Sequence, residues 1–295
     1  MTWLQLRLDA DPATASILED ALLDVGAAAV TMEDNADQPV YEPGVGETPV
    51  WQHTRVTGLF TADTDMTATL AELQSHYGQA LPALRIEILE DRDWIREWMD
   101  SYHPIQCGER LWICPSWREP VDPKAVNLLL DPGLAFGTGT HPTTWLCMQW
   151  LDQQDLSGLT VIDYGCGSGI LGIAALLLGA KKVIAVDNDP QALLATRDNA
   201  RRNNIDDARI ECLLPEHIPD GLHGDMVVAN ILAGPLTSLA PSLAATLSEG
   251  AAICLSGILQ SQAEELMGCY QEWFNALNLT TKDEWVRICG TKNHS

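Results

Sequence analysis

Two aspartates and three glycines near the middle of the chain have the types and spacing of a nucleoside-binding site. One apolar run ends at Asp163, and glycines follow at alternate positions, 165, 167 and 169. A second apolar run ends at Asp187. Glycines after a strand let a ligand approach the backbone at the start of a helix, and a carboxylate at the end of the next strand can hold two ribose hydroxyls. Gly165 and Asp187 lie about 20 positions apart, which is the separation expected for such a unit.

The residues around this turn favour a methyl donor over a dinucleotide. Residues 167–172, Gly-Ser-Gly-Ile-Leu-Gly, also fit the dinucleotide pattern G-x-G-x-x-G. Asp163, however, would repel a pyrophosphate, whereas a carboxylate suits the ammonium and sulfonium charges of S-adenosylmethionine. The order D-x-G-x-G-x-G resembles the first motif of Rossmann-like methyltransferases. A dinucleotide site and a tight turn without any ligand are the less favoured alternatives.

A glycine- and threonine-rich segment, residues 130–144, comes shortly before the first of these strands. In this topology such a segment lies over the carboxyl ends of the strands, where ligands bind. Phe136 could stack on or cover a ligand, and Thr140, Thr143 and Thr144 supply hydroxyls. An ordinary long loop with a helix cap at Thr143 is an equally good interpretation of this composition.

Asn230 follows a later apolar run, residues 226–229, and ends the expected strand at the position that faces the methyl group in this topology. Its side-chain oxygen and the following backbone carbonyl can accept hydrogen bonds from a substrate amine and so align the nitrogen lone pair. Amide and adenine N-methyltransferases follow this asparagine with Pro-Pro-Tyr, but here Ile-Leu-Ala follows. The missing aromatic clamp favours an aliphatic amine as the acceptor. A purely structural asparagine at the strand end remains an alternative.

The pattern from residue 143 onward alternates between helix and strand, which predicts a mainly parallel sheet with crossover helices. The expected strands are residues 159–164, 182–187, 209–213, 225–229, 251–256 and 284–290. The expected helices are residues 143–151, 169–178, 190–203, 235–247 and 259–276. Residues 105–130 resemble a hairpin leading into this domain. The expected fold is α/β, a Rossmann-like seven-stranded methyltransferase sheet over residues 105–295.

The first 90 residues predict a smaller ferredoxin-like α+β domain, because strands and helices follow in the order β-α-β-β-α-β. The segments are residues 3–8, 13–25, 27–32, 55–61, 66–77 and 84–89. Residues 91–104 are interpreted as a linker helix whose Trp94 and Trp98 dock onto one domain. Exposed tryptophans that hold a substrate are the alternative.

Composition sets further bounds on location and chemistry. The 295 residues suffice for two domains, and no apolar run reaches the length of about 20 residues that spans a bilayer. The first residues lack the pattern of a signal peptide, so a cytoplasmic protein without a membrane partner is expected. The eight cysteines form no C-x-x-C pair, and the histidines show no metal spacing. We therefore expect reduced, mostly buried thiols and no metal site.

The chain carries a net charge of −24, which argues against direct nucleic-acid binding, since phosphate binding needs clustered Lys and Arg. Residues 1–100 hold 19 Asp and Glu, five Arg and no Lys. Two explanations stay open. The charge can serve solubility, or it can attract a basic protein partner.

Taken together, these segments resemble the ribosomal protein L-eleven methyltransferase family. The resemblance runs through residues 111–117, the Phe-Gly-Thr-Gly-Thr-His-Pro-Thr-Thr loop, Asp-Tyr-Gly-Cys-Gly-Ser-Gly-Ile-Leu and Ala-Asn-Ile-Leu-Ala-Gly-Pro-Leu, and it covers essentially the whole chain. It implies multiple methyl transfer from S-adenosylmethionine to the α-amino and lysine ε-amino groups of a basic large-subunit ribosomal protein, free or on the ribosome. It also implies that the N-terminal domain recognises this substrate. A monomer is expected.

The candidate site residues follow from the motifs and from this resemblance. Candidates for donor binding are Thr144, Gly165, Gly167, Asp187, Asn230 and Phe136, and candidates for catalysis are Asn230, Thr140 and His141. An unperturbed lysine is mostly protonated at neutral pH, and desolvation favours the neutral amine that attacks. No dedicated base stands out, and a structural role for His141 in the loop is at least as compatible as proton transfer. The rival functions are a glutamine-amide N-methyltransferase acting on a translation protein and a non-enzymatic ribosome-associated binding module.

Overall fold

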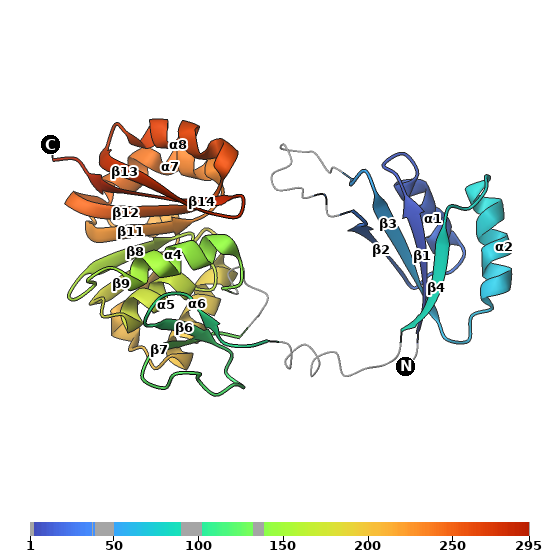
Figure 1. The fold of residues 1–295 in the computed structure, drawn as a ribbon, viewed down its shortest axis with the longest axis horizontal. Coiled ribbons are helices and arrows are strands. Elements are labelled where there is room, and N and C mark those ends of the chain that lie inside the picture. The colour runs from blue at the N-terminus through green and yellow to red at the C-terminus, as the bar shows by residue number, and fades with distance from the viewer. Residues whose placement is uncertain (1–2, 37, 39–49, 90–101, 132–138, 295) are drawn as a thin grey trace. The chain divides into compact units, whose positions relative to one another are not determined.

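The computed structural model describes residues 3–36, 38, 50–89, 102–131 and 139–294, which belong to two compact units, Met1–Trp98 and Met99–Ser295 (Figure 1). The division falls inside the segment interpreted as a linker. Most of that segment, including Trp94 and Trp98, lies outside the described residues, so its helical conformation stays a prediction.

The N-terminal unit has the predicted ferredoxin-like order. Its elements are β1 (Trp3–Ala10), α1 (Ala15–Asp24), β2 (Ala29–Asp34), β3 (Thr54–Thr61), α2 (Met66–Tyr77) and β4 (Leu84–Leu89). The strands form one antiparallel sheet in the order β2-β3-β1-β4. This arrangement confirms the predicted α+β fold of this part of the chain.

Strand alternation gives this sheet one apolar and one polar face. Leu6 and Leu8 of β1 are fully buried and pack with Leu18 and Leu22 of α1 and with Leu73 of α2. Both helices therefore cover the same face of the sheet. The residues between those leucines point to the opposite face, because successive side chains of a strand alternate.

The C-terminal unit contains the predicted seven-stranded sheet. Its strands are β8 (Thr160–Tyr164), β9 (Lys182–Val186), β10 (Ile210–Leu213), β11 (Gly224–Asn230), β12 (Leu247–Leu259), β13 (Phe274–Lys282) and β14 (Trp285–Lys292). They are ordered β10-β9-β8-β11-β12-β14-β13, with β8 to β12 parallel and β14 antiparallel to both its neighbours. The helices are α4 (Pro142–Asp152), α5 (Ile170–Leu177), α6 (Pro190–Arg202), α7 (Ala233–Ala245) and α8 (Ala263–Tyr270).

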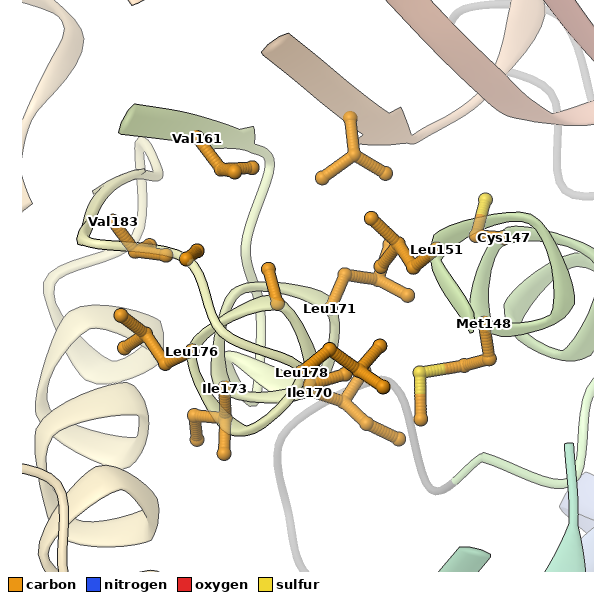
Figure 2. Close-up of a cluster of buried hydrophobic side chains, with 14 of the residues drawn as sticks. Cys147, Met148, Leu151, Val161, Ile170, Leu171, Ile173, Leu176, Leu178 and Val183 are labelled. Carbon is orange, nitrogen blue, oxygen red and sulfur yellow. The ribbon is translucent and has the colours of Figure 1, made fainter. Parts of the chain in front are cut away.

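Two hydrophobic clusters lie on the two faces of this sheet. The first joins α4, α5 and α6 to β8 and β9, and Figure 2 shows its centre, where Cys147, Met148 and Leu151 of α4 approach Ile170 and Leu171 of α5. The second joins α7 and α8 to β11, β12 and β14. The unit thus has a core of its own, and helices pack on both faces of its parallel strands.

The last third of the sheet corrects one sequence prediction. Residues 259–276 were expected to form one helix, but α8 ends at Tyr270 and β13 begins at Phe274. Tyr270 and Phe274 are both buried, so their helical spacing mimics a continuous apolar stripe across the turn. Pairing with β14 then selects the strand, which supplies the seventh member of the sheet.

The segment leading into this unit also differs from expectation. Strand β5 (Ile105–Gln106) pairs antiparallel with β6 (Leu111–Cys114), but β6 pairs in parallel with β7 (Val126–Leu129). The prediction of a hairpin formed by β6 and β7 is therefore wrong, because the strands of a hairpin are antiparallel. The connection between β6 and β7 is long enough to bring the chain back to the level at which β6 begins. It contains Pro115, Pro120 and Pro123, which favour turns.

Candidate functional site

The glycine-rich turn after β8 has a backbone that only glycine adopts readily. Gly165, Gly167 and Gly169 have φ values of 73°, 55° and 78°, in the left-handed region. A Cβ atom on Gly165 would lie 2.2 Å from Cγ2 of Ile231, so a side chain has no room there. The backbone N–H groups of Gly165 and Cys166 donate to the carbonyl of Val186 on the neighbouring strand, at 2.7 and 3.0 Å.

Asp187 follows β9 and contacts this turn, as its spacing from Gly165 predicts. Its Oδ2 accepts a hydrogen bond from the backbone N–H of Gly167 at 2.9 Å, and its Oδ1 accepts one from Asp189 N–H at 3.0 Å. A carboxylate has about four acceptor positions. The half-buried Asp187 therefore keeps acceptor capacity for hydroxyl groups of a ligand lying along the turn.

Asp163 lies underneath the turn. It is 1% exposed, and its Oδ2 accepts a hydrogen bond from the N–H of Gly172 in α5 at 2.8 Å. Burial raises the pKa of this carboxyl group from 3.8 to about 7; the Gly172 hydrogen bond opposes the shift, and the charge of Asp187 adds to it. Asp163 thus holds the start of α5 through Gly172, and it has almost no surface for direct contact with a ligand.

Replacing Asp163 with asparagine is expected to flatten the pH dependence of stability between about pH 4 and pH 7. The folded-state pKa of about 7 lies above the ordinary 3.8, so the unfolded chain loses this proton first as the pH rises. The carboxyl group therefore lowers the free energy of unfolding progressively across that window, and by a constant amount above it. Asparagine keeps an acceptor for Gly172 and does not ionise.

Urea titrations of both proteins at several pH values measure this effect. The free energy of unfolding of the wild type should fall, relative to that of the variant, from pH 4 to pH 7. A constant difference between the two proteins over this range would contradict the pKa shift of Asp163.

Helix α6 supports the turn through two residues that the sequence analysis missed. The hydroxyl of Thr196 donates to the carbonyl of Gly167 at 3.1 Å, and Nδ2 of Asn199 donates to the carbonyl of Ser168 at 2.8 Å. Thr196 is fully buried. The sequence could have indicated these residues, because they are polar and lie three positions apart on the inner face of a predicted helix. Buried polar groups need hydrogen-bond partners.

Asn230 and Thr144 are brought together from β11 and α4. Nδ2 of Asn230 donates to the hydroxyl of Thr144 at 3.3 Å, which leaves Oδ1 of Asn230 as an acceptor. Thr144 is fully buried, whereas Asn230 is half-buried at the carboxyl end of its strand. The next residue, Ile231, lies against Gly165, so the Asn230 strand end and the glycine turn are direct neighbours.

Two further predicted residues, His141 and Thr140, lie at the start of α4. His141 is the N-cap of this helix: its Nδ1 accepts from the N–H of Thr143 at 3.3 Å and lies 2.7 Å from the Thr143 hydroxyl. Its ring meets that of Trp285 edge-on at 4.7 Å. Burial lowers the pKa of His141, and Glu284 opposes the shift, so the imidazole is neutral at neutral pH. Thr140 is exposed beside it, and Phe136 lies outside the described residues.

Comparison with known proteins identifies the family of this chain. A family model described as "Ribosomal protein L11 methyltransferase (PrmA)" matches residues 2–293. The chain belongs to the ribosomal protein L11 methyltransferase family. The resemblance stated from the sequence motifs is thereby confirmed.

Relatives in this family match the chain over nearly its whole length. The ribosomal protein L11 methyltransferase of Cellvibrio japonicus is 56% identical over 292 residues, covering 99% of each chain. That of a Marinomonas species is 57% identical and covers 99% of this chain and all of the relative. The crystal structure of a ribosomal protein L11 methylase from Lactobacillus delbrueckii is 36% identical, with a TM-score of 0.60, and covers 65% of this chain and all of the solved one.

Three further features of the described residues concern metal ligands, helix hydrophobicity and cysteines. Within those residues, no cluster of three or more His, Cys, Asp or Glu side chains could hold a metal ion. None of the described helices is long and apolar enough to cross a membrane. The cysteines are all free, and all except Cys269 are buried.

Proposed function

We propose that this chain transfers methyl groups from S-adenosylmethionine to the α-amino group and lysine ε-amino groups of ribosomal protein L11, more than once per substrate molecule. The observation that carries this proposal is the Thr144–Asn230 pair at the carboxyl edge of the sheet, next to the glycine turn and Asp187. The pair places a hydrogen-bond acceptor for a substrate amine, Oδ1 of Asn230, beside the turn proposed to bind the nucleoside. Family membership supports both halves of the reaction.

The residues of the turn fit the methyl donor. The alternate glycines hold a left-handed backbone without side chains of their own, so the turn can let a flat nucleoside approach its main chain. Asp187 is proposed to supply hydrogen-bond acceptors for the ribose hydroxyls, and the backbone of Gly167 to lie beneath the donor. Phe136 is proposed to cover the donor. The donor supplies an already activated methyl group, so the protein mainly contributes proximity and alignment.

Asn230 is proposed to orient the attacking amine. With Nδ2 held by Thr144, its Oδ1 accepts an N–H of the substrate and directs the nitrogen lone pair toward the methyl group. The neutral form of the amine is favoured by desolvation as the site closes. His141 uses Nδ1 to cap α4, so its proposed role is to position the loop that contains Thr140, which adds a hydroxyl near the acceptor.

Replacing Asp187 with alanine is expected to weaken donor binding about 10- to 100-fold, because a hydrogen bond to a charged group is worth about 1.5–3 kcal/mol. The change also removes the acceptor for Gly167 N–H, which loosens the turn. Titration calorimetry with S-adenosylmethionine measures the effect. Asp189→Ala is the matched control, because it removes an exposed carboxylate two residues away that caps α6. Unchanged affinity in a folded Asp187→Ala protein would remove this residue from the donor site.

The N-terminal domain, residues 1–90, is proposed to recognise the protein substrate, and residues 91–104 to link it to the methyltransferase domain, residues 105–295. The 19 acidic residues among the first 100 attract a basic ribosomal protein, free or on the ribosome. We propose that the enzyme acts in the cytoplasm as a monomer and makes no direct contact with nucleic acid.

The position of the transferred methyl groups tests the choice of acceptor. Fragmentation mass spectrometry of L11 after the reaction should locate them on the α-amino group and on lysines. Methylated glutamine would instead support the amide methyltransferase. The structure favours the amine, because the residues after Asn230 are Ile231 and Leu232 and provide no aromatic surface for a planar amide.

A further inference from the structure

The arginines in the described part of the N-terminal unit gather in one place. Residues 1–89 contain three arginines, Arg7, Arg55 and Arg85, and no lysine, and all three arginines line one cavity of about 110 Å³ on the sheet face opposite the helices. Strand β1 lies between β3 and β4, so each of three adjacent strands contributes one arginine (Figure 1). Solubility does not account for such clustering in a strongly acidic unit.

The strand register places these like charges against one another. Arg7 and Arg85 are direct partners on β1 and β4, and Arg55 is the partner of Asp9, two positions along β1 from Arg7. Like charges directly opposite each other on an antiparallel pair destabilise the sheet. The arrangement therefore lowers the stability of the free unit, and a bound anion would reverse this effect.

The nearby carboxylates neutralise two of the three guanidinium groups. Arg7 pairs with Glu87 at 3.0 Å, and Arg55 makes a longer contact with Asp9 at 3.6 Å, with Glu33 opposite it on β2. Arg85 is exposed, and its side chain makes no hydrogen bond or ion pair within the described part of the chain. The lining thus has three positive and two negative groups, and Arg85 presents a free guanidinium fork.

Two buried polar atoms beside the cavity also lack partners. Among the described residues, Nε of Arg7 and Oγ1 of Thr57 find no hydrogen-bond partner, although both atoms are buried and Thr57 is only 7% exposed. Thr57 is the direct partner of Arg7 on β3. Buried polar groups without partners are costly, and a bound carboxylate would bring further acceptor oxygens to this place.

We infer that this sheet face docks the protein substrate and that its arginine cavity binds an aspartate or glutamate side chain of that substrate. The inference rests on the proposed function. The acidic surface of the unit attracts the basic substrate as a whole, and the arginine cavity accepts one carboxylate, which fixes the register of the two proteins. An RNA phosphate backbone fits less well, because the surrounding acidic residues repel a polyanion.

The test uses the full-length enzyme with intact L11. Arg85→Ala should raise KM for L11 about tenfold, the effect of losing a charge-assisted hydrogen bond, while kcat and the affinity for S-adenosylmethionine stay unchanged. Arg85→Lys should restore only part of the loss, because an ammonium lacks the bidentate fork. Ser16→Asp, an equal charge change at an exposed position of α1, is the control and should leave KM unchanged.

A double-mutant cycle identifies the partner carboxylate. Each acidic residue of L11 is changed to its amide and assayed with wild-type and Arg85→Ala enzymes, and one position should lose its effect on KM in the variant. Normal methylation with an unchanged KM, or no coupled position, would overturn this inference alone. A wild-type enzyme that fails to methylate L11 would overturn the proposed function and the inference together. Binding of a duplex RNA that is lost in Arg85→Ala would replace the carboxylate with a phosphate and also overturn it.

Arg85 also allows a test without substrate. Because its charge faces Arg7 without a carboxylate of its own, Arg85→Ala should leave the melting temperature unchanged or raise it. A clear fall in the melting temperature would show that Arg85 has a structural role and would contradict its assignment as a docking residue.

Discussion

Replacing Asn230 with alanine should lower kcat about 100-fold, the size of loss expected when a reacting group is misplaced by about 1 Å. The change removes the oxygen that orients the amine but leaves the glycine turn and Asp187 intact. The affinity for S-adenosylmethionine should therefore change little. Single-turnover kinetics with saturating donor, together with calorimetry, separate the two quantities.

Thr144→Val provides the matched control for this prediction. Thr144 is fully buried and touches Asn230 through its hydroxyl, so valine keeps the volume but frees the asparagine amide. The loss in kcat should be smaller than for Asn230→Ala, because Oδ1 is still present. Normal kcat in Asn230→Ala, with only a raised KM for the donor, would assign Asn230 to donor binding instead.

A chain that starts at Tyr102 should bind S-adenosylmethionine normally but lose about 100-fold or more in kcat/KM for intact L11, because the second binding module is gone. The C-terminal unit has two hydrophobic clusters of its own, which supports independent folding. Every residue proposed for donor binding lies beyond residue 130. The lost part carries most of the acidic excess that would attract a basic protein.

The comparison requires two substrates and two salt concentrations. A short lysine peptide should be methylated equally by the full-length and truncated enzymes, whereas intact L11 should distinguish them. The advantage of the full-length enzyme should shrink as salt rises, since charges are screened over about 8–10 Å at physiological ionic strength. Equal activity of a folded truncation on intact L11 would refute the recognition role of the N-terminal unit.

The sequence predicted the parts of the molecule whose local pattern and tertiary environment agree. The strand–turn–helix around Gly165 could be predicted because the alternate glycines and the flanking apolar runs specify it without help from distant residues. For Thr144 and Asn230, the sequence could predict only that both lie in the same site, not that they form a hydrogen bond. They are 86 positions apart, and their contact depends on the packing of α4 against the sheet.

The failures arise where distant pairing overrides the local pattern. Residues 274–282 form a strand because β14 offers them an edge, although Tyr270 and Phe274 continue a helical stripe. Parallel pairing of β6 and β7 likewise depends on the path of a long connection. Thr196 was overlooked because a threonine inside a helix reveals its partner, the Gly167 carbonyl, only once the turn is in place.

The central claim is methyl transfer from S-adenosylmethionine to amino groups of ribosomal protein L11 at the Asn230 site. Its most direct test is the transfer of a methyl label from the donor to purified L11, measured with the wild-type enzyme and with Asn230→Ala. The account predicts more than one labelled methyl group per L11 molecule with the wild type, on the α-amino group and on lysine side chains, and about 100-fold slower labelling with the variant. No label on L11 with the wild type, or equally fast labelling by both proteins, would contradict it.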